Sequence, residues 1–293
     1  MCIRDRAMWD EKYWPKAIGV NGYVNISGIK MSKSKGNVVP LRELVKEYSA
    51  DLVRINIVTS NEGLDDAEWK DESIATYESR FGFLLELIDA VKKMRVKKTR
   101  SIDLYLQSKL QQHINAATEY FEQMRFRSAI QSALFAATND IKWYIERVGG
   151  IEGCDKKTMK ETLSAIIRMI APLAPHIAEE MWKKLGGKGF VAVAAWPEAD
   201  DAKVDKNALE LEEIVMRCVE DLKHVIKIVG KKDKAYIYVA SPKEFVCFNE
   251  AKDFLRKRFG LKELNVFKAS EATYDPEGKA KKAKYGKPGI YLE

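Results

Sequence analysis

Histidine, cysteine and long apolar runs are scarce in this chain of 293 residues. The three histidines and four cysteines stand far apart, at His113, His176, His224, Cys2, Cys154, Cys218 and Cys247. This spacing argues against a zinc site built from local ligand pairs and against a disulfide framework, and it fits a protein of the reducing cytoplasm. No stretch approaches the roughly 18–20 apolar residues that a membrane-spanning helix needs, so we expect no membrane association.

The overall composition indicates a folded protein with a modest positive charge. Hydrophobic residues make up 46% of the chain and charged residues 32%, which is ordinary for a globular protein. The net charge of +7 permits a polyanionic partner without requiring one. Residues 1–6 (MCIRDR) lack the apolar segment of a signal peptide and are not continuous in character with the residues after them, so we expect the chain to begin within a larger protein.

The apolar pattern divides the chain into three parts and predicts a mainly α fold. Residues 1–70 are mixed. Residues 71–200 carry apolar side chains at spacings of three and four, which predict a helical bundle. Residues 201–293 alternate between helical and strand patterns and predict a small α+β module.

The same pattern locates individual elements. Strands are expected at residues 17–24, 25–29, 234–240 and 264–268. Helices are expected at residues 39–48, 74–91, 104–121, 125–148, 156–185, 209–229 and 242–259, with breaks at 149–150 and 171–175.

Residues 28–40 (GIKMSKSKGNVVP) form the stretch that points to chemistry, because three lysines alternate with two serines and end in Gly-Asn before a helix. Ammonium groups can neutralise the charge that grows on a phosphoryl centre during reaction, and hydroxyl and backbone N–H groups add hydrogen bonds. If the loop closes only during the reaction, these contacts stabilise the transition state more than the bound substrate. The alternative is a solvated basic turn, which composition alone favours but which leaves the order of the residues unexplained.

That order resembles the KMSKS loop of class I aminoacyl-tRNA synthetases specific for leucine, isoleucine, valine and methionine. Residues 49–54 (SADLVR) and 65–69 (DDAEW) resemble motifs that follow this loop in the family. Residues 173–182 (LAPHIAEEMW) resemble a helix of its anticodon-binding domain, and residues 190–197 resemble the Trp-Pro connector behind that helix.

Within this group the chain is most similar to leucyl-tRNA synthetases of the archaeal and eukaryotic type. The similarity lies in residues 40–43, 125–131, 139–144 and 280–293, and overall it extends from about residue 7 to the end. The H-x-G-H signature, the amino-acid pocket and the editing domain of such enzymes have no counterpart. The resemblance therefore implies the C-terminal part of a synthetase: the end of the nucleotide-binding domain, an anticodon-binding-type bundle and a tRNA-binding C-terminal domain.

In the family, leucine reacts with ATP to give leucyl-adenylate, and the leucyl group is then transferred to tRNA(Leu). The resemblance implies that Lys30 and Lys33 are catalytic and that Lys30, Met31, Ser32, Lys33 and Ser34 contact ATP. Mg²⁺ is expected on the ATP, with no metal held by this chain. A chain with only this part is expected to be monomeric, to bind tRNA weakly and not to activate leucine.

The resemblance also suggests which residues contact tRNA. In the bundle these are Arg125, Arg127, Lys142 and Arg147, since Arg and Lys position phosphates. In the tail they are Lys281, Lys282, Lys284, Ile290 and Glu293, because the C-terminal domain of archaeal leucyl enzymes approaches the long variable arm of the tRNA, where exposed bases can be read. For each basic residue the alternative is a solvated surface charge, as it is for the six basic residues within 92–100.

Other assignments remain open at this point. The chain could derive from an isoleucyl, valyl or methionyl enzyme, or it could be a non-catalytic tRNA-binding module that retains the loop as a relic. Asp51 and Arg54 are spaced to pair on a helix, and they are interpreted as structural, as are Asp65, Asp66 and Trp69. His176 follows Pro175 at a helix start, and it is interpreted as a packing or capping residue.

Overall fold

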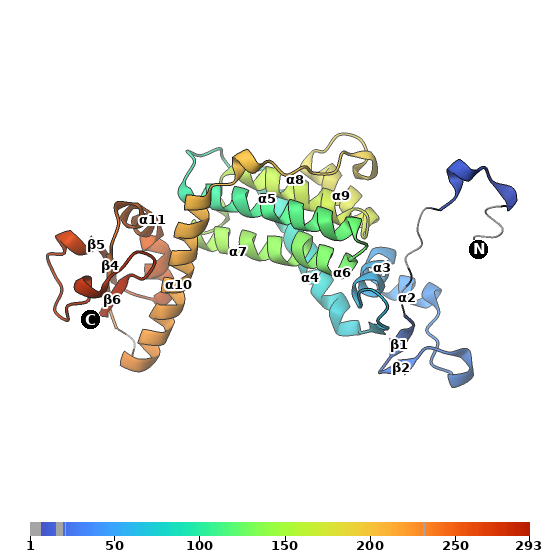
Figure 1. Cartoon of the computed structure of the whole chain (residues 1–293), viewed down its shortest axis with the longest axis horizontal. Helices are drawn as coiled ribbons and strands as arrows, with labels where there is room; N and C mark the ends of the chain where they lie inside the picture. Colours follow the sequence, from blue (N-terminus) through green and yellow to red (C-terminus); the bar gives the residue numbers. More distant parts are fainter. Residues whose placement is uncertain (1–6, 16–19, 21, 231) are drawn as a thin grey trace.

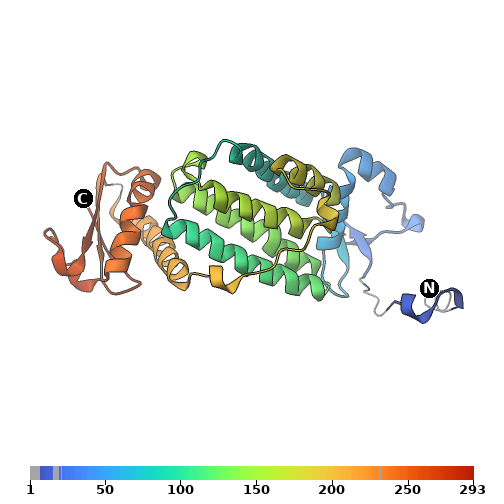
Figure 2. The same cartoon turned by 90° about the horizontal axis from the view of Figure 1, so that it is seen from above.

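The computed structural model describes residues 7–15, 20, 22–230 and 232–293. Figure 1 shows an elongated arrangement with short strands and helices at one end, long helices in the middle and a second small sheet at the other end. Figure 2 shows from above that the long helices lie side by side between the two ends. The predicted mainly α fold is confirmed. None of the described helices is long and apolar enough to cross a membrane.

The N-terminal part contains a small sheet of strand order β2-β1-β3, in which β1 pairs antiparallel with β2 and parallel with β3. Its elements are β1 Val24–Ile26, β2 Ile29–Lys30, α2 Leu41–Glu47, α3 Ala50–Thr59 and β3 Ala67–Trp69. The predicted strand boundary after residue 24 is wrong, because the chain reverses at Ser27-Gly28, whose φ angles of 52° and 72° suit a two-residue hairpin turn. Residues 17–19 and 21 of the first predicted strand lie outside the described residues.

The bundle consists of helices whose apolar stripes face one another. Its elements are α4 Asp71–Val91, α5 Ser101–Glu122, α6 Phe126–Ile130, the π-helical turn η3 Gln131–Ala136, α7 Ala137–Arg147, α8 Lys156–Ile170 and α9 Pro175–Leu185. Fully buried side chains such as Leu84, Leu106, Leu134 and Ile166 form the shared core. The stretch 156–185 is two helices, because the residue before Pro175 is driven out of the helical region.

Helix α10 (Lys206–Val229) runs from the bundle into the C-terminal module, a name that we give to α10 and the elements after it. Ala208 near its start packs in the bundle core, whereas most of the buried residues from Leu211 onward pack in a second core. The module adds β4 Lys234–Val239, α11 Pro242–Phe259, β5 Glu263–Lys268 and β6 Gly289–Leu292. Its sheet has the order β5-β4-β6, with β5 parallel and β6 antiparallel to β4, and α10 and α11 supply the core against one face.

Candidate functional site

The KMSKS-like segment is a hairpin followed by a short loop whose backbone is held by one asparagine. Strand β2 ends at Lys30, residues 33–35 form a 3₁₀ turn, and Gly36 follows with φ of 70°. Asn37 Oδ1 accepts the N–H of Ser32 at 2.8 Å, and Asn37 Nδ2 donates to the carbonyl of Lys30 at 3.2 Å. Because both ends of this amide are engaged, Asn37 fixes the shape of the loop.

The two predicted catalytic lysines differ in their surroundings. Lys33 is exposed, and no described residue forms an ion pair or hydrogen bond with its ammonium group. Lys30 is also exposed, but its Nζ lies 3.2 Å from the centroid of the Tyr23 ring in a cation–π contact. Lys33 is therefore free to meet an anion, whereas Lys30 has to leave the ring first.

The remaining predicted ATP contacts belong to the same turn. The N–H of Met31 donates to the carbonyl of Val24 at 2.9 Å, which anchors the start of the loop on β1. The hydroxyl oxygens of Ser32 and Ser34 lie 2.8 Å apart. Residues 30–34 thus form one short segment, from the end of β2 into the 3₁₀ turn, that carries both hydroxyl groups and ammonium groups.

Acidic side chains near β3 support the hairpin from the side. Glu68 Oε1 accepts the N–H of Gly28 at 2.9 Å, and Asp66 Oδ1 accepts the N–H of Tyr23 at 2.7 Å. The indole N–H of Trp69 donates to Oδ1 of Asp71, the first residue of α4, at 2.9 Å. This geometry favours a structural role for Asp66 and Trp69, and it adds Glu68 as a residue that holds the turn.

Asp51 joins the loop-bearing part to the bundle, in a way that local spacing did not predict. Its Oδ2 accepts the N–H of Ile177 at 2.6 Å, and its Oδ1 lies 2.8 Å from His176 Nδ1. The carboxylate therefore caps the N-terminus of α9, where an acidic group is favourable. The predicted pair with Arg54 is wrong, because that side chain is exposed on α3 and forms no ion pair with any described residue.

A second link connects the segment after α3 to the start of α6 and involves Arg125, one of the predicted tRNA contacts. Glu62 accepts the backbone N–H of Ser128 at 2.7 Å and forms an ion pair with Arg125 at 3.4 Å. Burial raises the pKa of Glu62, but the bonds from Ser128 and the charge of Arg125 outweigh it and leave that pKa below its usual value. Arg127 is exposed, and no described residue pairs with its guanidinium group.

Arg147 is not available to a nucleic acid, so its predicted phosphate contact is wrong. Its side chain is 1% exposed, and Nε and Nη2 donate to Glu212 of α10 at 2.7 and 3.1 Å. The indole N–H of Trp143 donates to the same carboxylate at 2.8 Å. Arg147 is a fixed part of the contact between the bundle and the C-terminal module. Lys142, by contrast, is exposed, with its Nζ 5.0 Å from the centroid of the Phe83 ring.

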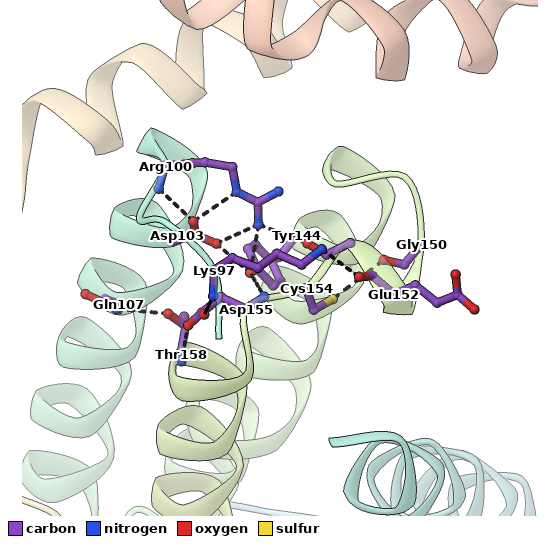
Figure 3. Close-up of polar contacts among 11 residues, drawn as sticks. Lys97, Arg100, Asp103, Gln107, Tyr144, Gly150, Glu152, Cys154, Asp155 and Thr158 are labelled. Atoms are coloured by element: carbon purple, nitrogen blue, oxygen red, sulfur yellow. Dashed lines mark hydrogen bonds and ion pairs between the residues drawn. The ribbon is translucent and has the colours of Figure 1, made fainter. Parts of the chain in front are cut away.

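The basic run 92–100 is partly built into the end of the bundle (Figure 3). The guanidinium of Arg100 forms a fork on Asp103, with donor–acceptor distances of 3.0 and 2.9 Å. Asp103 also accepts the hydroxyl of Tyr144 at 2.6 Å, and this hydroxyl accepts the N–H of Asp155 at 2.8 Å. The backbone and ammonium of Lys97 are engaged as well. These two cations hold the helix ends together and are not free surface charges.

The C-terminal residues proposed to contact tRNA are part of the folded module. Lys281, Lys282 and Lys284 are exposed on the segment that precedes β6. Ile290 pairs in register with Ile237 and packs against the core under α10 and α11, which argues against the predicted base contact. Glu293 is exposed, and its carboxylate accepts the hydroxyl of Tyr236 at 3.1 Å on the other face of the sheet.

The sequence analysis missed three glutamates that hold the hairpin turn, the segment after α3 and the C-terminal module in place. Glu62, Glu68 and Glu212 contact partners that are 66, 40 and 65 residues away in the chain. No local motif marks such pairs. Among the described residues, no group of histidine, cysteine, aspartate or glutamate side chains is arranged to hold a metal ion.

Comparison with known families matches two parts of this chain. The model described as "Anticodon-binding domain of tRNA ligase" matches residues 103–239, and the model described as "tRNA synthetases class I (M)" matches residues 6–79. The second match contains the KMSKS-like loop, and the first contains most of the bundle together with α10 and β4.

Individual relatives point to the leucine enzymes. The leucine–tRNA ligases of Pyrococcus horikoshii and Methanococcoides burtonii are each 35% identical to this chain over 80% of its length. The enzyme of Methanothrix thermoacetophila is 26% identical over 98% of this chain. The chain spans about a quarter of the first two relatives and 36% of the third.

A solved structure of similar fold is a ternary complex of the LeuRS of Agrobacterium radiobacter K84 with tRNA and LeuAMS. The TM-score is 0.55 at 19% sequence identity, with 84% of this chain and 32% of that chain covered. At this identity the similarity concerns the fold.

Proposed function

We propose that this chain supplies the KMSKS loop and the tRNA-binding parts of a leucine–tRNA ligase. The proposal follows from its similarity to a segment that makes up about a quarter of the length of the leucine–tRNA ligases of Pyrococcus horikoshii and Methanococcoides burtonii. The observation that carries the proposal is the geometry of residues 30–37. The loop is braced by Asn37 and presents an unpaired, exposed Lys33 beside two hydroxyl groups. The intact enzyme would activate leucine with ATP and transfer it to tRNA(Leu).

In the first step a leucine carboxylate oxygen attacks the α-phosphorus of ATP, and the bond to the bridging oxygen of the leaving pyrophosphate breaks. Negative charge grows on the pyrophosphate as this bond opens. The ammonium group of Lys33 stabilises that charge, and Lys30 joins it when it leaves the ring of Tyr23. Mg²⁺ enters with the ATP as part of the substrate. Residues 30–34 thereby act on the transition state more strongly than on bound ATP.

In the second role the bundle and the C-terminal module lie along the tRNA. Arg125, Arg127 and Lys142 contact phosphates from the bundle, since they are exposed and basic. Lys281, Lys282 and Lys284 contact the long variable arm from the module, together with Glu293, which directly follows β6. The contacts from Asp51 and Glu62 keep the loop-bearing part in a fixed position against the bundle, so tRNA and ATP are held in one frame.

The test replaces Lys33 by Ala in a full-length leucine–tRNA ligase that carries this chain as its corresponding part. The matched control is Lys46→Ala, which removes an exposed lysine from α2. Leucine-dependent pyrophosphate exchange should fall by about 100-fold or more for Lys33→Ala, as expected when a charge clamp is removed, and should be unchanged in the control. Equal exchange rates for the two variants would mean that the loop is a relic and that the chain is a binding module.

A further inference from the structure

A small polar hollow lies where the loop-bearing part meets the bundle, and it has no role in the chemistry described above. Its volume is about 290 Å³, and its walls come from the end of α3, from β3, from the start of α4 and from α6 with the π-helical turn η3. We call it the junction hollow. A volume of this size suits a small group such as one phosphate and is below that of typical pockets for drug-sized ligands.

The junction hollow is lined by hydrogen-bond donors whose side chains have no partner in the described part of the chain. Lys70, Ser73, Arg127 and Gln131 all contribute to its wall. No described residue forms a hydrogen bond or ion pair with the side chains of these four residues. Cationic, hydroxyl and amide side chains are the kinds of groups with which proteins bind phosphate oxygens, and here they come from separate elements around one hollow.

One carboxylate also lines the hollow, and its position argues for a specific site. Glu68 uses Oε1 to accept the N–H of Gly28 at 2.9 Å, so this oxygen is committed to the turn of the KMSKS hairpin. With two cations and one carboxylate the hollow remains positive. The lining also includes the buried residues Thr59 and Tyr77, whose hydroxyl oxygens lie 2.6 Å apart, and the Thr59 hydroxyl also bonds to the carbonyl of Ile55.

The wall formed by η3 adds a structural reason to expect a ligand here. Gln131 and Phe135 belong to this π-helical turn and line the hollow. π-Helical turns are rare, and they occur frequently at functional sites because they re-aim side chains that a regular helix would direct elsewhere. In this chain the turn follows directly on α6, which carries Arg127.

We propose that the junction hollow is a phosphate subsite, in which Arg127 and Lys70 bind the oxygens of a single phosphate group and Ser73 donates a hydrogen bond to it. This proposal rests on the proposed function, since a backbone phosphate of bound tRNA is the first source of the ligand. Free inorganic phosphate is the other source with the same chemistry. Glu68 lines the subsite and also holds the turn of the hairpin that carries the catalytic lysines, so the phosphate binds beside the residue that holds that turn.

The experiment compares the full chain with Lys70→Gln/Arg127→Gln and with the control Lys157→Gln/Lys160→Gln, which removes two lysines of α8 that do not line the hollow. Affinity for leucine tRNA is measured across a salt series. If RNA supplies the phosphate, the Lys70/Arg127 variant binds about ten-fold more weakly than the control. The slope of log K against log salt also becomes shallower by about one.

A second probe distinguishes the two sources. Thermal unfolding is followed in millimolar inorganic phosphate and in chloride at equal ionic strength. If free phosphate is the ligand, it stabilises the wild type and the control, but not the Lys70→Gln/Arg127→Gln variant, and tRNA binding is unaffected. If the Lys70/Arg127 variant and the control behave alike with both probes, the subsite is overturned.

The variant Ser73→Ala separates a built subsite from a diffuse positive surface, because it removes a hydrogen bond without changing the charge. A phosphate subsite loses affinity for its ligand by a few-fold in this variant. A surface that attracts RNA only by charge is unaffected by Ser73→Ala, and that result would also overturn the subsite. If the wild-type chain binds no tRNA, the proposed function fails, while phosphate stabilisation that depends on Lys70 and Arg127 would leave the subsite intact.

Discussion

The ion pair between Arg147 and Glu212 offers a quantitative test of how the C-terminal module is held on the bundle. Both side chains are 1% exposed, and Glu212 accepts three hydrogen bonds, two from Arg147 and one from Trp143. The substitution Glu212→Leu removes all three and leaves the buried guanidinium without its carboxylate partner, with the long contact from Nη1 to the carbonyl of Glu250 remaining. Removal of one member of a buried pair costs about 3–5 kcal/mol, a large share of the roughly 5–15 kcal/mol that stabilises a typical protein.

Urea unfolding of the full chain measures this loss. The control Lys223→Gln breaks an exposed pair with Glu220, whose side chains are 43% and 71% exposed, and should cost less than about 1 kcal/mol. The double variant Arg147→Met/Glu212→Leu should regain most of the stability, because no unpaired charge remains. The reasoning is refuted if Glu212→Leu is as stable as the control, or if the double variant is no more stable than Glu212→Leu.

Three further predictions concern single contacts. Asn37→Ala should speed hydrogen exchange of the Ser32 amide, because the lost hydrogen bond is worth about 1 kcal/mol. An unchanged exchange rate would mean that the loop keeps its shape without the Asn37 side chain. Tyr144→Phe should lower stability by about 1–3 kcal/mol in thermal unfolding, since its hydroxyl links Asp103 to the start of α8, and an unchanged midpoint would contradict this. The pKa of Glu62 is lowered in the folded state, so its carboxylate stabilises the fold above its unfolded pKa of about 4.3, and this contribution is lost as the pH falls through the folded pKa. Glu62→Gln should therefore flatten the acid side of the stability curve, and curves that stay parallel to the wild type would disprove this role.

Helices whose signals lie within a few residues could be predicted well. Helix α11 has the predicted bounds Pro242–Phe259, because Ser241 and Glu244 form a capping box and Gly260 ends the helix in the left-handed region. Helix α10 begins three residues earlier than the predicted 209. Its first turn is capped by Asp205, a signal that the apolar spacing does not contain.

Features that depend on distant partners could not be predicted in this way. Strand β3 exists because it pairs in parallel with β1, with Ala67 opposite Val24. The role of Asp51 depends on α9, which lies 126 residues further along the chain. Arg147 shows the same limit for the site: an arginine near a helix end has the same local pattern whether it faces solvent or a buried glutamate.

The candidate site divides along the same line. Residues 30–34 could be predicted as one functional segment because their order is local, and the structure places them between the end of β2 and the 3₁₀ turn. The loop is supported by Glu68 of β3 and by Asp66, the residue directly before β3. Both are distant in sequence from the groups that they bind, so this support could be identified only in three dimensions. For the tail, the strand β6 explains why Ile290 faces the core, since alternate residues of a strand point to opposite faces.

The most direct test of the central claim is the binding of this chain to leucine tRNA and to a tRNA with a short variable arm, across a salt series. The C-terminal variant for this test is Lys281→Gln/Lys282→Gln/Lys284→Gln, because deletion of the last residues would remove β6 from the sheet. The account predicts tighter binding of leucine tRNA by the wild type and loss of that preference in the triple variant. Equal binding of both tRNAs, falling steeply with salt, would show only nonspecific phosphate attraction and would contradict the assignment to the leucine enzymes.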